Sequence, residues 1–293
     1  GGGEGQLGKV QFSALASMQG AGQLTEQAVH RGATGFWQVQ ALKGIRDDHG
    51  LSASFRQAQF MGGRLPEFLG VGVQKGGTTT LQRLLEQHPG AFLPAAKELH
   101  YFSLHYALGE GWYREQFAEA GAQQRCGEIT PYYLFHPEAP RRIHALLPEV
   151  RLIVLLRDPV ERALSQYFHA RRLGFETLEL EAALAAEPGR LAGAEQRLAA
   201  PGSRDDSHQK HSYMARSRYE LQLARYEALF APQQLLVLRS EDLFAEPERI
   251  WQQIQAFLGL APVPMPAPLE RANAGLGEAA AVPEAVRDQL RRQ

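Results

Sequence analysis

The chain has 293 residues, of which 44% are hydrophobic, and its 31 basic residues nearly balance its 32 acidic residues. This length and apolar content suffice for one large α/β domain with an appendage, and the near-neutral charge excludes a general binder of nucleic acid or another polyanion. The single cysteine, Cys126, cannot form an intrachain disulfide, and no apolar run approaches the ~20 residues of a membrane span. We therefore expect a cytoplasmic protein that binds neither nucleic acid nor membranes.

Residues 1–60 differ in composition from the rest of the chain. They mix Gly, Gln and Ala with short apolar patches and predict two or three short helices. We expect this small helical segment to pack against the main domain or to form a flexible arm. The alternative is that it docks to a neighbouring domain or a carrier protein. Residues 61–293 form the main domain in this prediction.

Residues 68–86 predict a strand, a glycine turn and a helix. The apolar run 68–73 is typical of a buried strand, and Gly76-Gly77 follows it directly. Three leucines then recur at helical spacing, at positions 81, 84 and 85. This geometry points free backbone N–H groups and the positive end of a helix dipole at an anion.

The side chains around this turn favour a phosphate or sulfate site. Lys75 adds a positive charge, and Thr78, Thr79 and Thr80 add hydroxyl donors. The alternative is an ordinary strand–turn–helix connection whose threonines only cap the helix. A nucleoside-triphosphate P-loop has its lysine after the last glycine, whereas Lys75 precedes the glycine pair, so we expect a site of another type.

Residues 97–102 are interpreted as a further short strand. In a strand Glu98 and His100 would share one face, and an acid beside an imidazole suits proton abstraction. The competing interpretation is a solvated strand edge. Their closeness in sequence to the glycine turn favours the functional interpretation.

A second strand–helix unit begins at Arg151. Five consecutive apolar residues, 152–156, predict a central parallel strand, and Pro159 opens a helix that runs to about Arg172. Ligands of open α/β sheets lie at the carboxyl ends of strands. Arg157 stands there, and with Ser165 it would suit a phosphate rather than a magnesium nucleotide, which needs a carboxylate at this place.

The remainder predicts helices, one last strand and an insertion. Residues 173–210 are polar and alanine-rich and are interpreted as a lid or an acceptor-binding insertion, with His208 and His211 as surface residues. A helix over 213–230, a strand at 235–238, a helix over 247–258 and a final short helix from about Pro283 complete the pattern.

Taken together, these motifs resemble those of sulfotransferases that use PAPS, 3′-phosphoadenosine 5′-phosphosulfate, particularly the heparan-sulfate-type and bacterial branch. The resemblance covers about residues 66–276 and rests on five short motifs in the same order, at 75–80, 155–165, 97–113, 128–133 and 241–260. It implies a P-loop-like, three-layer α/β fold in which helices flank a central parallel sheet.

The resemblance also implies roles for individual residues. Lys75 would neutralise charge on the bridging oxygen as the product PAP leaves, and Glu98 would be the general base, with His100 as rival or helper. No metal is implied. The implied cofactor-binding residues are Lys75, Gly76, Gly77, Thr78, Thr79, Thr80, Arg157, Ser165 and Arg271. Arg271 stands in a loop that lacks the family's usual lysine.

Two other functions and several acceptors stay open. A nucleotide-dependent phosphotransferase would need a lysine after the glycines and a carboxylate for magnesium, and a non-catalytic scaffold would be expected to have lost the lysine or the base. For a sulfotransferase, the accepting group would be a hydroxyl or, less favourably, an amine, and the acceptor would be a glycan, a small metabolite or a carrier-bound β-hydroxyacyl chain.

Overall fold

A computed structural model describes residues 63–266 and 277–292, all within one compact unit that spans residues 52–293. The helical segment predicted over residues 1–60, and with it the predicted domain boundary, lies outside the described residues. So does Arg271.

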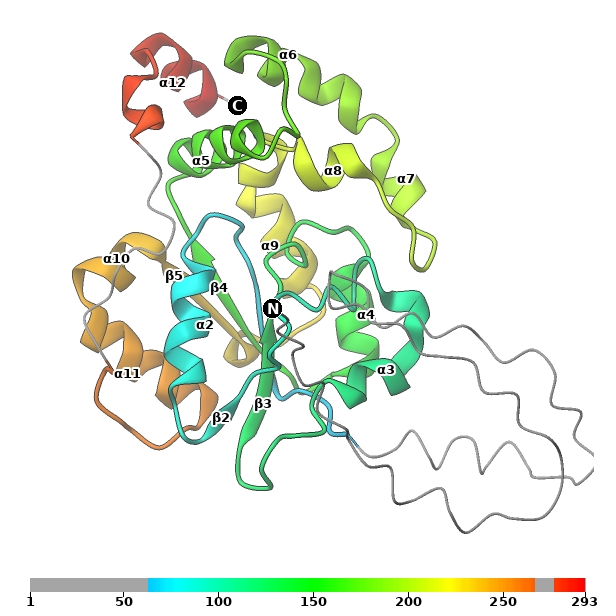
Figure 1. Ribbon diagram of the computed structural model, residues 1–293, viewed down its shortest axis with the longest axis vertical. Helices are drawn as coiled ribbons and strands as arrows, with labels where there is room; N and C mark the ends of the chain where they lie inside the picture. The colour runs from blue at the N-terminus through cyan, green and yellow to red at the C-terminus, as the bar shows by residue number, and fades with distance from the viewer. Residues whose placement is uncertain (1–62, 267–276, 293) are drawn as a thin grey trace, which may run out of the picture. The chain divides into compact units, whose positions relative to one another are not determined.

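Five parallel strands form the central sheet, in the order β2-β3-β1-β4-β5 (Figure 1). The sheet consists of β1 (Phe68–Gly72), β2 (Ala91–Phe92), β3 (Arg125–Ile129), β4 (Arg151–Leu156) and β5 (Leu235–Arg239). The strands at 68–73, 151–156 and 235–238 are thus confirmed. They are short and almost wholly apolar because helices cover both faces of the sheet.

The helices alternate with the strands along the chain. They are α2 (Thr78–Glu86), α3 (Gly109–Glu115), α4 (Ala139–Leu146), α5 (Pro159–Arg172), α6 (Leu180–Leu191), α7 (Ala194–Leu198), α8 (Asp206–Lys210), α9 (Tyr219–Glu227), α10 (Ser240–Ala245), α11 (Pro247–Leu258) and α12 (Glu284–Arg291). Short 3-10 turns are η1 (Tyr106–Leu108), η2 (Ala215–Ser217), η3 (Pro232–Gln234) and η4 (Glu278–Ala281). Within the described part of the chain, no helix is long and apolar enough to cross a membrane.

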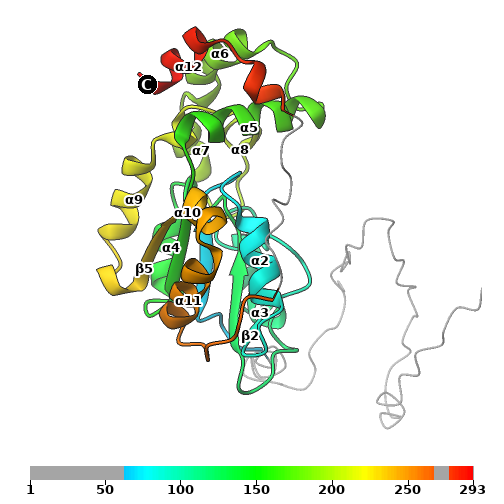
Figure 2. The same ribbon diagram turned by 90° about the vertical axis from the view of Figure 1, so that its left-hand side faces the viewer.

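Alternate side chains of the strands enter two separate cores. In β4, Leu152 and Val154 pack with residues of α4 and α9, whereas Ile153 and Leu155 pack with residues of α2 and α11. Figures 1 and 2 show the two helix layers on either side of the sheet. The predicted three-layer α/β fold is therefore confirmed.

The strand order reverses at β1. This strand lies between β3 and β4, and the chain moves from one side of β1 to the other between those two strands. In open parallel sheets, such a reversal leaves room for a ligand beyond the carboxyl ends of the strands. The loop that joins β1 to α2 lies at this place.

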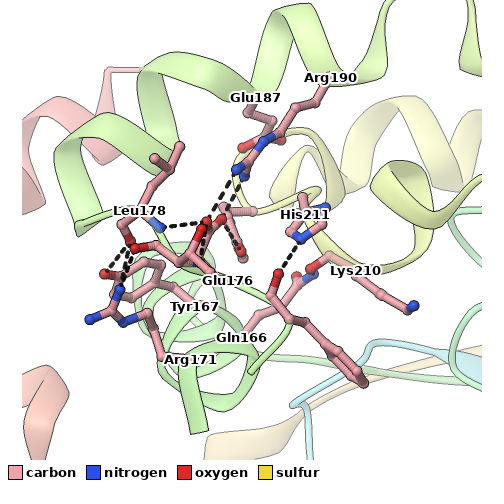
Figure 3. Close-up of polar contacts among 12 residues, drawn as sticks. Gln166, Tyr167, Arg171, Glu176, Leu178, Glu187, Arg190, Lys210 and His211 are labelled. Atoms are coloured by element: carbon pink, nitrogen blue, oxygen red, sulfur yellow. Dashed lines mark hydrogen bonds and ion pairs between the residues drawn. The ribbon is translucent and has the colours of Figure 1, made fainter. Parts of the chain in front are cut away.

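A third core joins α5 to α6 and α12. In the connection after α5, the buried carboxylate of Glu176 contacts Arg190 at 2.5 Å and the Tyr213 hydroxyl at 2.8 Å, and it accepts the amides of Thr177 and Leu178 at 2.9 Å (Figure 3). These contacts join the connection after α5 to α6 and to Tyr213, and the Tyr167 hydroxyl of α5 donates to Leu178 O of the same connection at 3.0 Å.

Two local predictions are wrong. Residues 97–102 form no strand: the chain turns there, with the amides of Ser103 and His105 both donating to His100 O, at 3.2 and 3.0 Å. Alternation of side chains along the sequence could not reveal this turn, because it depends on the left-handed backbone of Glu98 and His100, with φ of 55° and 53°.

His208 is buried rather than exposed. Its ring stacks on Phe135 at 4.2 Å between centroids and shares a hydrogen bond of 2.8 Å with the Tyr132 hydroxyl. Burial lowers the pKa of His208 to about 3, so the ring is neutral. His211 is half-buried and contacts Phe175 O at 2.9 Å.

We expect Glu176→Gln to destabilise the protein by roughly 3 kcal/mol at pH 7. Burial alone would raise the pKa of Glu176, but the contacts with Arg190, Leu178 and Tyr213 outweigh it and lower the pKa to about 2 from 4.5. Ionised Glu176 therefore stabilises the fold at neutral pH, and this contribution disappears as the pH falls from about 5 towards 2. Urea unfolding at pH 7 and pH 3 measures the effect, which should shrink at the lower pH.

The matched control is Glu179→Gln. The Glu179 side chain is 85% exposed and pairs with Arg171 at 3.1 Å, so its loss should cost less than about 0.5 kcal/mol. Equal losses for the two variants would show that the Glu176 contacts do not support the insertion.

Candidate active site

The loop between β1 and α2 is tied to the main chain of β4. Val73 N donates to Leu155 O at 3.0 Å, and Gly76 N donates back to Val73 O at 3.0 Å. A Cβ atom at Gly76 would lie 2.4 Å from Leu155 O, so a larger residue would separate the loop from the sheet. This close approach is the reason for glycine at position 76.

The loop leaves backbone donors available at the start of α2. Gly77 is the N-cap residue, with a left-handed φ of 93°, and no side chain caps this helix end. Because the first amides of a helix have no partner within it, those of Gly77, Thr78 and Thr79 are unused among the described residues. They provide an anion-binding end of the kind that the sequence predicts.

The three threonines of the loop differ in what their hydroxyls do. Thr79 Oγ1 accepts from Lys97 Nζ at 2.7 Å. Thr80 is 3% exposed, and its buried hydroxyl has no partner in the described part of the chain. Thr78 is buried at the helix start. A buried hydroxyl without a partner is uncommon in folded proteins and is accounted for if a bound group uses it.

Positive charge gathers around Lys75 without a balancing acid. In residues 63–266 and 277–292, no carboxylate pairs with its ammonium group. Burial, and after it the charges of Arg172, Arg157 and Lys97, lower the pKa of Lys75 to about 8. An ammonium group surrounded by cations favours a strongly anionic ligand.

Arg157 and Ser165 lie where the sequence predicts them, at the end of β4 and on α5. Arg157 Nη1 donates to Lys75 O at 3.1 Å, so the two predicted cofactor residues are in direct contact. Arg157 forms no ion pair with any described residue, and Ser165 is half-exposed with its hydroxyl unused. The nearby Asp158 carboxylate caps α5 by accepting from Glu161 N at 2.9 Å.

Glu98 and His100 do lie together, although not in a strand. Glu98 Oε2 lies 3.5 Å from His100 Nε2, and the side chains are 37% and 16% exposed. The other ring nitrogen of His100 faces Ser103 Oγ at 3.2 Å. The acid–imidazole pair expected from the sequence is therefore present, with the carboxylate as the more accessible member.

A buried carboxylate is linked to the backbone of this pair through a threonine hydroxyl. Glu128, at the end of β3, accepts hydrogen bonds from Thr130, Tyr113 and Tyr133 at 2.7, 3.0 and 2.7 Å. The hydroxyl of Thr130 also accepts from the backbone of His100 at 3.3 Å. Burial raises the pKa of Glu128, although these hydroxyl donors oppose that effect.

His169 is a site residue that the sequence analysis missed. It follows Ser165 by four residues on α5 and therefore lies on the same face of the helix. Burial lowers its pKa, the charges of Lys75 and Arg172 lower it further, and the charge of Glu98 opposes them. The charges of Lys75 and Glu98 therefore both act on His169, and the i, i+4 spacing from Ser165 was the signal available in the sequence.

Comparison with known proteins identifies the family of this chain. Residues 65–267 match the family model described as "Sulfotransferase domain". The chain is 29% identical to a solved sulfotransferase from Alicyclobacillus acidocaldarius, with a TM-score of 0.60, over 71% of this chain and 87% of that one.

The described residues contain no group of three or more His, Cys, Asp or Glu side chains that could hold a metal ion.

Curated relatives are similar over part of their length. The chain is 30% identical over 213 residues to human bifunctional heparan sulfate N-deacetylase/N-sulfotransferase 3, covering 68% of this chain and 23% of that protein. It is 43% identical over 106 residues to the membrane-associated sulfotransferase kil1 of Dictyostelium discoideum, covering 35% of this chain and 22% of kil1. In both relatives the match spans less than a quarter of the protein. With its fold, the unused amides at the start of α2 and a family match over most of its length, the chain belongs to the sulfotransferase-domain family.

Proposed function

We propose that this protein transfers the sulfuryl group of PAPS to a hydroxyl group of an acceptor. The observation that carries the proposal is the placement of an unpaired lysine, a row of unused amides and an acid–imidazole pair at one edge of the sheet. Lys97 Nζ, directly before Glu98 in sequence, donates to Thr79 Oγ1 at 2.7 Å, which joins the segment of the acid–imidazole pair to the start of α2. Family membership adds the reaction class.

The residues present fit PAPS as the donor. Its phosphosulfate end needs several donors and positive charge, which Lys75, the amides of residues 77–79 and the buried hydroxyl of Thr80 supply. Its 3′-phosphate needs a second cationic site, which the guanidinium group of Arg157 and the hydroxyl of Ser165 would form. The threonine hydroxyl without a partner is the feature that an ordinary helix cap leaves unexplained.

The chain's own residues would act by charge placement and proton transfer. PAPS supplies an activated sulfuryl group, whose transfer leaves additional negative charge on the phosphate. Lys75 would neutralise that charge, and donors held in place before the reaction stabilise it most effectively. Glu98 takes the proton of the acceptor hydroxyl, and His100, at 3.5 Å, either receives that proton or performs this role itself.

The proposal extends to three acceptor classes. The first is a glycan, since several relatives are named as heparan sulfate sulfotransferases. The others are a small hydroxylated metabolite and a β-hydroxyacyl chain on a carrier protein, which residues 1–60 would help to dock. Screening of acceptors with labelled PAPS distinguishes the three.

We expect PAP to bind with micromolar affinity in the presence of EDTA, and ADP to bind at least tenfold more weakly, because ADP lacks the 3′-phosphate. Isothermal titration calorimetry measures both affinities. Ser165→Ala should weaken the binding of PAP but not that of ADP. Tighter binding of ATP than of PAP, or a requirement for magnesium, would contradict the proposal and favour a phosphotransferase.

PAP affinity should fall as the pH rises through about 8, the pKa of Lys75. The charged amine attracts the phosphate, so its deprotonation weakens binding, by roughly tenfold for one lost charge interaction. Lys75→Ala should lower affinity at pH 7 by a similar factor and remove most of this pH dependence. Titrations at pH 7 and pH 9.5 test the point, and an unchanged pH profile in Lys75→Ala would contradict it.

Glu98→Gln should lower kcat by at least about a hundredfold with little change in PAP affinity, because it removes proton acceptance and keeps the shape of the side chain. His100→Gln serves as the comparison. If Glu98→Gln stays active while His100→Gln is inactive, the base is His100.

A further inference from the structure

Arg216 is a buried arginine without an acidic partner. It lies in η2 and is 2% exposed, and no described carboxylate forms an ion pair with it. A buried guanidinium group that lacks a counter-charge is costly. The hydrogen bonds of Arg216 should therefore indicate which structural role offsets this cost.

Two of its three hydrogen bonds stabilise the local turn. Nη2 donates to His208 O and Gln209 O, both at 2.9 Å, which joins α8 to η2. The guanidinium carbon lies over the rings of Tyr132 and Phe135, 5.1 and 5.0 Å from their centroids. None of these contacts uses the remaining amino group, Nη1.

Nη1 contacts the loop between β1 and α2, which carries Lys75 and is called the lysine loop. It donates to Oε1 of Gln74, a residue 142 positions away in sequence and directly before Lys75. Lys75 has a φ of 71°, a left-handed conformation that residues other than glycine seldom keep unless their surroundings hold them there. The carbonyl of Lys75 is held from the other side by Arg157, at 3.1 Å.

We propose that Arg216 is a positioning residue that, through Gln74, holds Lys75 in the orientation needed for sulfuryl transfer. Two contacts hold the lysine and together form a brace. Arg157 donates to the carbonyl of Lys75, and Arg216 donates to the side chain of the preceding residue, Gln74. The role assigned to Lys75 rests on the proposed function, but the brace itself does not. Without the contact at Gln74, the loop relaxes and the amine gains access to water.

The test uses Gln74→Leu in the 293-residue chain, because this change removes the acceptor and leaves the buried arginine in place. The reactivity of Lys75 towards acetic anhydride is followed from pH 6 to 11 by peptide mass spectrometry, and kcat with PAPS is measured in parallel. The midpoint of Lys75 reactivity lies near 8 in the parent protein. In Gln74→Leu we expect it to rise by about one pH unit and kcat to fall about ten- to a hundredfold.

Gln116→Leu is the matched control, since the side-chain amide of Gln116 donates only to the Trp112 carbonyl, at 3.0 Å. It should leave both quantities unchanged. An unchanged midpoint in Gln74→Leu would overturn the proposal, and so would a raised midpoint with unchanged kcat. If the parent protein transfers no sulfuryl group from PAPS, the proposed function fails, while the comparison of midpoints still decides whether the brace exists.

Discussion

Excess positive charge at the end of β1 is the feature on which the rest of the site depends. Lys75 is partly buried beside other cations, and burial and these charges both disfavour its protonated form. The loop keeps this arrangement because Val73 N donates to Leu155 O of β4, and Gly76 N donates to Val73 O. A binding site that holds its charges in place before the anion arrives need not reorganise when it binds.

The insertion after α5 supports a helix that carries residues of this site. Helix α5 carries Ser165 and His169 along one face, and its opposite side packs into the third core with α6 and α12. The buried Glu176 ties the connection that follows to Arg190 and Tyr213. Residues 173–210 therefore pack against the helix that carries Ser165 and His169.

The acid–imidazole pair stands on irregular backbone and needs support of a different kind. Glu98 and His100 both have positive φ, and the His100 backbone is anchored through Thr130 to the buried Glu128. A buried carboxylate is tolerated when its oxygens accept several hydrogen bonds, and here three hydroxyl groups provide them. The network fixes the direction in which the pair points.

What the sequence determined by itself is local. The units Phe68–Glu86 and Arg151–Arg172 were predictable because apolar runs, glycine at a turn and proline at a helix start act over a few residues. Lys75, Arg157 and Ser165 could be assigned to one edge of the sheet, because parallel strands end together there. Tertiary structure alone decided the turn at residues 97–102, the burial of His208 and the contact between Arg216 and Gln74. These depend on chain segments that meet only after the sheet and its helix layers have assembled, and no periodicity along the sequence records which segments meet.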